Sequence, residues 1–378
     1  MKIVITTGIF DPESGGPATY TPKIAALLNE KGWEVTVITY SDEPRYDFDS
    51  KYRFKLVRIV RGNKLVNRVR YFFTVLKYAR SCDLIYTLDW FAAGLPVALA
   101  AKFLGKKYVV RVGGDYVWEH VYSEISGEVP VTLSDFYERG LYLRGAYSTL
   151  YRIIDFILRG GAHIVFNTER QRELYLRFYH LRSDAVSVIY NPVPRLETAG
   201  IVRGTPTHEF VYWGRLVVLK NIDSLIRAFA QARLPADYTL AIIGEGPQRE
   251  NLVKLISELG VGERVRLESA MRLPALFERV KDCRASVVAS WTDISPNQIY
   301  ESMAIHLPEL ITSENYLSIR DQLPVMIDPR SVTDIAEKLE MLADDARYDD
   351  YSRRFDAIVF KQDWDDVLAQ HLVVFGTI

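Results

Sequence analysis

The sequence has few cysteines and lacks any long apolar run. Cys82 and Cys283 are its two cysteines, and they lie so far apart in the chain that they need not pair. Such usage is typical of a protein kept in a reducing compartment. No run approaches the roughly 20 apolar residues that a membrane-spanning helix needs, and the opening MKIVITTGIF turns polar too soon for a signal peptide. These absences predict a soluble cytoplasmic protein.

An excess of charge of either sign is also missing. Lysine and arginine number 47 against 48 aspartates and glutamates, a formal net charge of −1, so no overall field attracts nucleic acid or an anionic membrane. Low-complexity tracts and short-period repeats are absent as well. What remains is a chain of 378 residues, 48% of them hydrophobic, which is long enough for two domains with sizeable cores.

The first half of the chain alternates short apolar runs with helical patterns, which predicts a Rossmann-like doubly wound α/β sheet. The expected strands lie around Ile3–Ile5 and Val35–Ile38 and at Leu84–Thr87, Tyr108–Val112, His163–Phe166 and Val186–Ile189. The dinucleotide fingerprint G-x-G-x-x-G is missing after the first strand, which argues against a dehydrogenase. A loop containing DPESGG stands there instead and ends at Gly15 and Gly16. Adjacent glycines let a ligand approach the backbone, although a structural turn is the simpler explanation of an isolated pair.

A second alternating set follows the connector at residues 191–194, and it predicts a second Rossmann-like domain. Its expected strands are Phe210–Trp213, Tyr238–Ile243, Val265–Leu267 and Ala285–Ala289. We therefore expect an N-terminal domain over residues 1–189 and a C-terminal domain over residues 190–350. Residues 351–378 should form helices that pack back on the N-terminal domain. The cleft between two such domains is the natural place for a ligand.

The stretch Ser290–Pro308, SWTDISPNQIYESMAIHLP, holds the strongest candidate site. It follows a buried strand, forms a polar turn over Thr292–Asn297, and becomes helical from Gln298. Ligands bind at this carboxyl end of an open α/β sheet, where backbone N–H groups meet the positive end of a helix dipole. Asp293 in the turn and Glu301 in the helix bracket those amides. Taken alone, these two acids would be an ordinary turn cap and a solvated helix residue.

Five segments taken together resemble the retaining glycosyltransferases of the GT-B fold, most closely the large family 4 group. In chain order they are GGPATYTPKIAALLNEKGWEVTVIT, WGRLVVLKN, IIGEGPQRENLVKLISELGVGERVRL, the stretch around Asp293 and Glu301, and WDDVLAQHL. The resemblance implies two Rossmann-like domains that face each other across a cleft. It also implies transfer of a sugar, with retention of configuration, from a UDP- or GDP-linked donor to a glycan, lipid-linked or small-molecule acceptor. Such enzymes usually work without a metal, and no cofactor is expected besides the donor substrate.

The resemblance further implies roles for particular residues. Arg215 and Lys220 match the basic pair that grips the donor diphosphate, where stabilising the developing charge is usually the largest catalytic contribution. Glu301 matches the acid that binds the ribose hydroxyls, and Asp293 stands where the family usually has a glutamate in contact with the sugar. Asp115 is expected to fill part of the role that a histidine has in the acceptor site of many family members. The remaining positions expected to bind the donor are Gly15, Gly16, Gly244, Ile294, Ser295, Pro296 and Asn297.

Three departures from the family pattern leave a second interpretation open. Asp293 is shorter than glutamate, the chain reads Gly113-Gly114-Asp115 where many members carry a histidine, and His306 replaces the glycine of a turn. A histidine there conflicts with a left-handed backbone conformation, which predicts a remodelled turn or an altered site. The second interpretation is a catalytically degenerate protein of the same fold that binds nucleotide sugars or acts as a scaffold.

Two segments mix basic and aromatic residues and are candidates for contact with a membrane surface. They are residues 64–80 and 145–159. Such helices can lie at a membrane interface, which would place the protein peripherally on the inner face of the membrane. A helix with an aromatic core face and a charged outer face is the simpler explanation. Binding of nucleic acid is not expected, because the overall charge is balanced and no nucleic-acid motif accompanies the segments.

Overall fold

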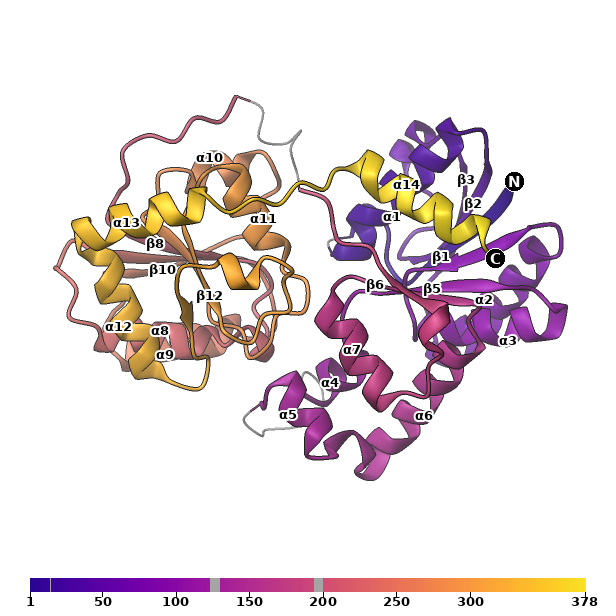
Figure 1. Ribbon diagram of the computed structural model, residues 1–378, viewed down its shortest axis with the longest axis horizontal. Helices are drawn as coiled ribbons and strands as arrows, with labels where there is room; N and C mark the ends of the chain where they lie inside the picture. Colours follow the sequence, from indigo (N-terminus) through magenta and orange to yellow (C-terminus); the bar gives the residue numbers. More distant parts are fainter. Residues whose placement is uncertain (14, 123–129, 194–199) are drawn as a thin grey trace. The chain divides into compact units, whose positions relative to one another are not determined.

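The computed structural model describes residues 1–13, 15–122, 130–193 and 200–378, which form two compact units (Figure 1). Unit 1 comprises Met1–Val117, Gly140–Tyr190 and Trp364–Ile378, and unit 2 comprises Trp118–Arg139 and Asn191–Asp363. The division departs from the predicted domains in two places. Residues 118–139, expected in the first domain, group with unit 2, and unit 2 continues past residue 350 to Asp363.

Unit 1 is built on a seven-stranded sheet in which every pairing is parallel, in the order β3-β2-β1-β4-β5-β6-β7. Its strands are β1 (Lys2–Thr7), β2 (Glu34–Ser41), β3 (Lys55–Val60), β4 (Leu84–Thr87), β5 (Tyr108–Val112), β6 (His163–Phe166) and β7 (Val186–Val188). All strands predicted for this half are confirmed. Strand β3 was not predicted, and its Arg58 is buried in an ion pair with Asp49 at 2.7 Å.

Helices cover both faces of this sheet, as a doubly wound fold requires. They are α1 (Gly16–Glu30), α2 (Lys64–Ala79), α3 (Gly94–Leu104), α6 (Gly145–Gly160), α7 (Glu169–Phe178) and α14 (Trp364–Gly376), and α4 (Tyr116–His120) begins in unit 1 and ends in unit 2. Helices α1 and α14 pack together on one face, and α2, α3 and α6 lie side by side on the other (Figure 1).

The last helix, α14, belongs to the core of unit 1. His371 donates from Nδ1 to the Val367 carbonyl at 2.7 Å, so its Nε2 accepts from the Tyr86 hydroxyl at 2.8 Å. Burial, together with the nearby Arg111 guanidinium, lowers the pKa of His371 to about 3, which keeps the ring neutral. Of the predicted helical region 351–378, α14 therefore packs with the first half of the chain. The helix before it, α13 (Asp345–Asp356), packs in unit 2 instead.

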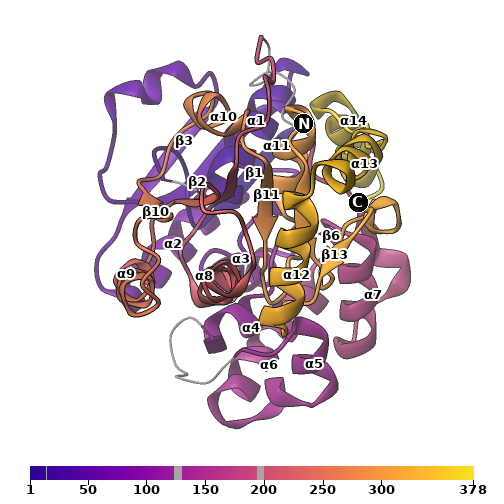
Figure 2. The same ribbon diagram turned by 90° about the vertical axis from the view of Figure 1, so that its left-hand side faces the viewer.

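Unit 2 is built on a six-stranded parallel sheet in the order β10-β9-β8-β11-β12-β13. Its strands are β8 (Glu209–Trp213), β9 (Thr239–Ile243), β10 (Val265–Glu268), β11 (Ala285–Val288), β12 (Glu309–Thr312) and β13 (Met326–Ile327). Its helices are α5 (Leu133–Glu138), α8 (Ile222–Gln231), α9 (Arg249–Glu258), α10 (Ala275–Val280), α11 (Asn297–Ala304), α12 (Val332–Ala343) and α13. Helices α8 and α12 lie side by side (Figure 2). Strands β12 and β13 were not predicted from the sequence.

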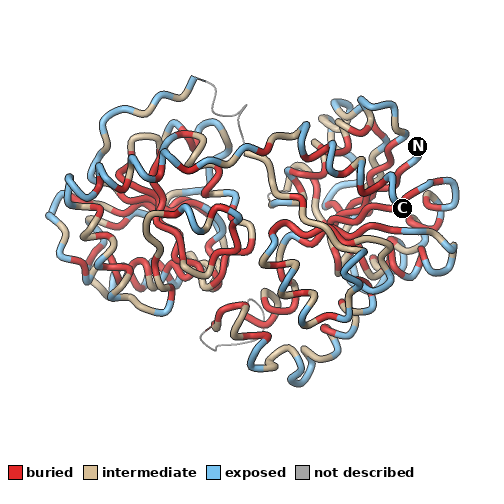
Figure 3. The backbone as a smooth tube through the Cα atoms, in the orientation of Figure 1, coloured by how far each residue is buried: buried red, intermediate tan, exposed pale blue. Residues whose placement is uncertain are grey.

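The buried residues are concentrated in the strands of the two sheets (Figure 3). The strands β8, β9 and β11 are buried almost throughout, because helices cover both of their faces, and this produces the continuous apolar runs seen in the sequence. The two Rossmann-like sheets expected from the sequence are confirmed.

The turn at His306 is not remodelled, contrary to the prediction from the sequence. His306 adopts the left-handed conformation itself, with φ of 57°, and histidine is among the non-glycine residues that tolerate this region best. Its Nδ1 lies 3.2 Å from the Asp356 carboxylate on α13. The prediction of a steric conflict at this position is wrong, because the turn keeps the left-handed geometry without glycine.

Candidate active site

The predicted donor-binding residues of the second half gather at one edge of the sheet in unit 2. They follow the carboxyl ends of β8, β9 and β11. Strands β8 and β11 are neighbours, and the chain leaves them in opposite directions, toward β9 and toward β12. This is a topological switch point, the position at which open α/β sheets bind ligands.

Gly244 and Gly214 allow the loops after β9 and β8 to lie against each other. A Cβ atom on Gly244 would stand 1.9 Å from the Gly214 carbonyl oxygen. The Leu216 N–H donates to the Glu245 carbonyl at 2.9 Å, which joins the two loops. Gly244, predicted to bind the donor, therefore supports the loop that carries Arg215 in this structure.

Arg215 extends toward solvent from that loop. Its side chain is 69% exposed, and the guanidinium lies 4.0 Å from the Glu119 carboxylate at the end of α4. At this distance and exposure the pair contributes little to stability. Arg215 is therefore available to an anionic ligand.

Lys220, predicted at the donor diphosphate, and Asp293, predicted at the donor sugar, form an ion pair in the structure. The Lys220 Nζ lies 2.7 Å from Asp293 Oδ2, and the Ser290 hydroxyl donates to the same oxygen at 3.0 Å. The side chains are 25% and 9% exposed, so the pair is shielded from water. The backbone of Asp293 is held as well, since its N–H donates to Glu314 and its carbonyl accepts from Tyr316, both at 3.0 Å.

Glu301 has a partner that sequence reasoning missed. The indole Nε1 of Trp213, the last residue of β8, donates to Glu301 Oε2 at 2.7 Å. This bond fixes the direction of the carboxylate on α11. The motif WGR pointed to Arg215, and its tryptophan was the signal that could have identified Trp213.

The turn before α11 presents backbone donors. Within the described ranges, the N–H groups of Ile294, Ser295 and Asn297 donate to no backbone carbonyl, and the N-cap Pro296 provides no side-chain cap. Asn191 holds the turn from outside, because its Nδ2 donates to Ser295 Oγ at 3.1 Å and to Asn297 Oδ1 at 3.0 Å. A turn of this kind, at the positive end of a helix, suits an anion.

A buried carboxyl group lies at the other end of α11, and no motif pointed to it. Glu309, the first residue of β12, has no exposed surface and accepts from Ser286 at 2.8 Å and from Ser302 at 2.7 Å. Burial, with smaller contributions from Asp293 and Glu301, raises the pKa of Glu309 to about 8. The group therefore anchors α11 in its protonated form over much of the neutral range.

The remaining predicted residues lie in unit 1. Gly15 has φ of 145°, and a Cβ there would stand 2.8 Å from the Ile9 side chain, whereas Gly16 opens α1 in uncrowded space. Asp115 follows β5 and is fully buried, with its Oδ2 accepting from the Tyr175 hydroxyl at 2.7 Å. Its carboxylate thus faces the core of unit 1 in this structure.

A further acid in unit 1 was missed. Asp89 follows β4, and its Oδ1 accepts from the N–H groups of Phe91 at 2.9 Å and Ala92 at 2.7 Å. Burial raises the pKa of Asp89. A Cβ on Gly8, after β1, would stand 2.0 Å from Asp89 Oδ2, so Gly8 makes room for this carboxylate. Strands β1 and β4 are neighbours, which puts Asp89 at the switch point of the first sheet.

Among the described residues, no group of three or more His, Cys, Asp or Glu side chains is placed to hold a metal ion. None of the helices in the described ranges combines the length and the apolar character that crossing a membrane requires.

Two family models match the chain one after the other. The model described as "Glycosyl transferase 4-like domain" matches residues 15–192, and "Glycosyl transferases group 1" matches residues 207–345. A curated relative from Streptococcus parasanguinis, the UDP-N-acetylglucosamine--peptide N-acetylglucosaminyltransferase GtfA subunit, is 29% identical over 120 residues. The match covers 30% of this chain and 23% of that protein, so the chain spans less than a quarter of this relative's length.

Solved structures resemble the whole chain. Anabaena HepE in complex with UDP and glucose is 15% identical, with a TM-score of 0.76 and 100% of both chains covered. The sucrose-phosphate synthase of Thermosynechococcus elongatus is 18% identical, with a TM-score of 0.75 over 100% of this chain and 98% of that one. At these identities the likeness concerns the fold alone, and it confirms the predicted fold class of two Rossmann-like domains of the GT-B type.

Proposed function

We propose that this chain, which belongs to the glycosyltransferases of the GT-B fold, transfers a sugar from a UDP-linked donor to an acceptor hydroxyl with retention of configuration. The observation that carries the proposal is the switch point of unit 2, where two cations, the turn before α11 and two carboxylates meet. UDP is favoured over GDP because the similar structure of HepE holds UDP and glucose. The acceptor class we propose is a glycan, a lipid-linked sugar or a small molecule.

In the proposed mechanism the donor leaves as a nucleoside diphosphate, so negative charge grows on its phosphate oxygens. Arg215, Lys220 and the N–H groups of the turn at 294–297 stabilise that charge, which is usually the largest catalytic contribution. Lys220 has three N–H donors. One of them binds Asp293, and the other two are directed to phosphate oxygens in the proposed complex. The nucleotide sugar is a substrate, and we propose no resident cofactor.

In the proposed complex, the carboxylates of Glu301 and Asp293 bind the ribose and the sugar of the donor. Glu301, oriented by Trp213, accepts hydrogen bonds from the ribose hydroxyls. Asp293, held by Lys220 and Ser290, accepts from hydroxyls of the sugar and lies close to the carbon at which the bond breaks. On the acceptor side we propose the loop that carries Asp115, in unit 1. The Gly15–Gly16 turn of the same unit stays a proposed contact of the donor.

Titration calorimetry with UDP, GDP and ADP tests the donor site. UDP should bind best, and Arg215→Ala and Glu301→Gln should each weaken it about tenfold or more, since each removes a charge-assisted hydrogen bond. Arg233→Ala and Glu258→Gln, at exposed positions of the same unit, serve as matched controls and should bind like the wild type. Unchanged UDP affinity in both site variants would refute the assignment.

Turnover separates an enzyme from a degenerate binder. Release of UDP from a UDP-sugar should be measurable without an acceptor, though slow, because water replaces the acceptor poorly. Asp293→Ala should lower that rate more than it lowers the affinity for UDP, since Asp293 lies at the sugar in the proposed complex. Tight binding of a UDP-sugar without any release of UDP, with any acceptor extract, would favour the non-catalytic alternative.

We also propose that α2 contacts an anionic membrane surface. Its inner face buries Tyr71 and Val75, but its outer face exposes the apolar Leu65 and Phe73, at 71% and 62%, beside basic residues such as Arg70. Apolar side chains flanked by cations on one helix face suit the interface of an anionic bilayer. Binding of the protein to vesicles of anionic lipid is the measurement that tests this contact.

A further inference from the structure

Residues 118–139 lie in the first half of the sequence but belong to unit 2. We use the name "arm" for their described parts, 118–122 and 130–139. The two parts hold each other, because Trp118 Nε1 donates to the Val131 carbonyl at 2.9 Å and the ring of Tyr122 packs between Trp118 and Phe136. The arm thus has a small aromatic core of its own.

The arm makes polar contacts with the loops around Asp293. The Leu133 N–H donates to the Thr292 hydroxyl at 2.9 Å, and the hydroxyls of Ser134 and Tyr316 are 3.0 Å apart. Leu133 is the first residue of α5, and the N–H groups of a first helical turn need partners outside the helix. Thr292 supplies one of them.

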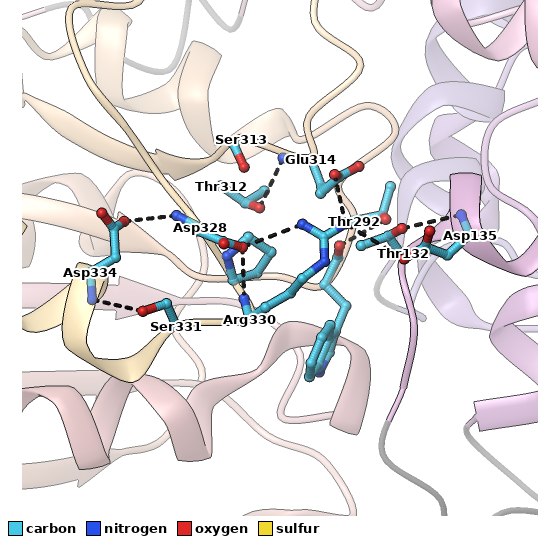
Figure 4. A network of polar contacts seen from close by, with 12 residues as sticks. Thr132, Asp135, Thr292, Thr312, Ser313, Glu314, Asp328, Arg330, Ser331 and Asp334 are labelled. Carbon is cyan, nitrogen blue, oxygen red and sulfur yellow. Dashed lines mark hydrogen bonds and ion pairs between the residues drawn. The ribbon is translucent and has the colours of Figure 1, made fainter.

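An arginine extends the contact, as Figure 4 shows. The guanidinium of Arg330 lies 3.6 Å from the Asp135 carboxylate on the arm and 3.1 Å from the Glu314 carboxylate. Asp328, at 3.3 Å, holds the same guanidinium from the side of β13. The arm, the loop after β12 and the loop after β13 are therefore joined through one cation.

These contacts converge on the segments that fix the position of Asp293. Thr292 precedes Asp293 in the chain, and Glu314 and Tyr316 hold the Asp293 backbone from both sides. The arm contacts Thr292 and Tyr316 directly and reaches Glu314 through Arg330. At its other end, Glu119 faces Arg215 at 4.0 Å. In the sequence the arm begins three residues after Asp115, at the end of the loop proposed for the acceptor.

We propose that the arm is a positioning element of the donor site, with Thr292 and Arg330 as the residues through which it sets the place of the Asp293 carboxylate. The inference rests on the proposed function in one respect, the contact of Asp293 with the donor sugar. It adds Ser134, Asp135, Thr292 and Arg330 as positioning residues. A segment from the acceptor half of the chain thereby controls the geometry of the donor half.

Thr292→Val tests this proposal, because it keeps the shape of the side chain but removes the acceptor of the Leu133 N–H. We expect kcat with a UDP-sugar to fall about tenfold, the worth of one well-made hydrogen bond, while the Kd for UDP changes less than about twofold. Hydrogen exchange of the Asp293 and Tyr316 amides should become faster. Thr292→Ser keeps the hydroxyl and should restore both measurements.

Asp344→Ala is the matched control, since it removes the acceptor of a backbone N–H, that of Arg347 at 3.0 Å, elsewhere in unit 2. It should lower the unfolding midpoint without changing kcat or the exchange at Asp293. Losses of kcat that follow the unfolding midpoint equally in Thr292→Val and Asp344→Ala would overturn the proposal, and so would unchanged exchange at Asp293 and Tyr316 in Thr292→Val.

Ser134→Ala, which removes the hydroxyl facing Tyr316, replaces Thr292→Val if that variant does not fold, with the same expected and contrary results. A failure of the proposed function can be told apart from a failure of the proposal about the arm. If the wild type binds no UDP, the donor assignment fails, and the exchange rates of the Asp293 and Tyr316 amides still decide whether the arm positions this loop.

Discussion

Glu309→Gln is a sharp test of how unit 2 holds α11. Glu309 accepts from Ser286 on β11 and Ser302 on α11, and its Oε1 has no hydrogen-bond partner among the described residues. Glutamine has nearly the same shape as the protonated glutamate, and it carries no charge at any pH. Replacing the carboxyl with an amide therefore isolates the cost of ionising this buried group.

The sign and size of the effect follow from the pKa of Glu309, which burial raises from 4.5 to about 8. Between these values the folded protein binds the proton more strongly than the unfolded chain does. The stability that Glu309 contributes is therefore fully present below pH 4.5 and is lost as the pH rises through 8. At about 1.4 kcal/mol per pKa unit, the whole loss is on the order of 5 kcal/mol, and about half of it falls between pH 5.5 and 7.5.

Urea unfolding followed by tryptophan fluorescence at pH 5.5, 6.5, 7.5 and 8.5 measures this loss. The result is taken as the difference between variant and wild type at each pH, because two units need not unfold in one step. The unfolding free energy of Glu309→Gln, relative to the wild type, should grow by an amount on the order of 2–3 kcal/mol between pH 5.5 and 7.5. Glu258→Gln, at an exposed position of α9, should show no such trend. A difference that stays constant from pH 5.5 to 8.5 would refute the idea that Glu309 is buried as the neutral acid.

Two further predictions concern Lys220 and the outer face of α2. Lys220→Met leaves the shielded Asp293 carboxylate without its cation, so we expect the unfolding free energy to fall by about 2 kcal/mol and UDP affinity to fall at least tenfold. Arg215→Ala is the comparison, because removing this exposed side chain should lower UDP affinity but hardly change the unfolding free energy. Equal unfolding free energies in the two variants would contradict a stabilising ion pair between Lys220 and Asp293. Phe73→Glu should lower binding to anionic vesicles several-fold, whereas Val202→Glu, 76% exposed in unit 2, should not. Equal binding by both variants would exclude α2 as the contact.

Much of the fold could be predicted from the sequence because parallel strands covered on both faces are continuous apolar runs. The bounds of β4, β5 and β6 match their predicted runs residue for residue. The strands that escaped prediction break that rule. β3 carries Arg58, β12 begins with Glu309, and β13 has two residues. A charged residue in a short segment looks exposed unless its buried partner is known, and Asp49 and the serines 286 and 302 come from elsewhere in the chain.

The residues of the candidate site could be predicted only in part. Arg215, Lys220, Asp293 and Glu301 could be selected from the sequence because motifs preserve residue types and spacing. Their partners could not be. The bond from Trp213 to Glu301 spans 88 residues, and that from Lys220 to Asp293 spans 73.

The sequence by itself determined the two alternating α/β patterns, the glycine turns and the identity of the charged residues near the switch point, since these depend on local periodicity and spacing. The tertiary structure alone decided that Lys220 pairs with Asp293, that Glu309 is buried as an acid, and that the arm contacts Thr292. Each of these depends on distance and dielectric environment in space, because a pKa or a hydrogen bond is set by the groups that folding brings within a few ångströms.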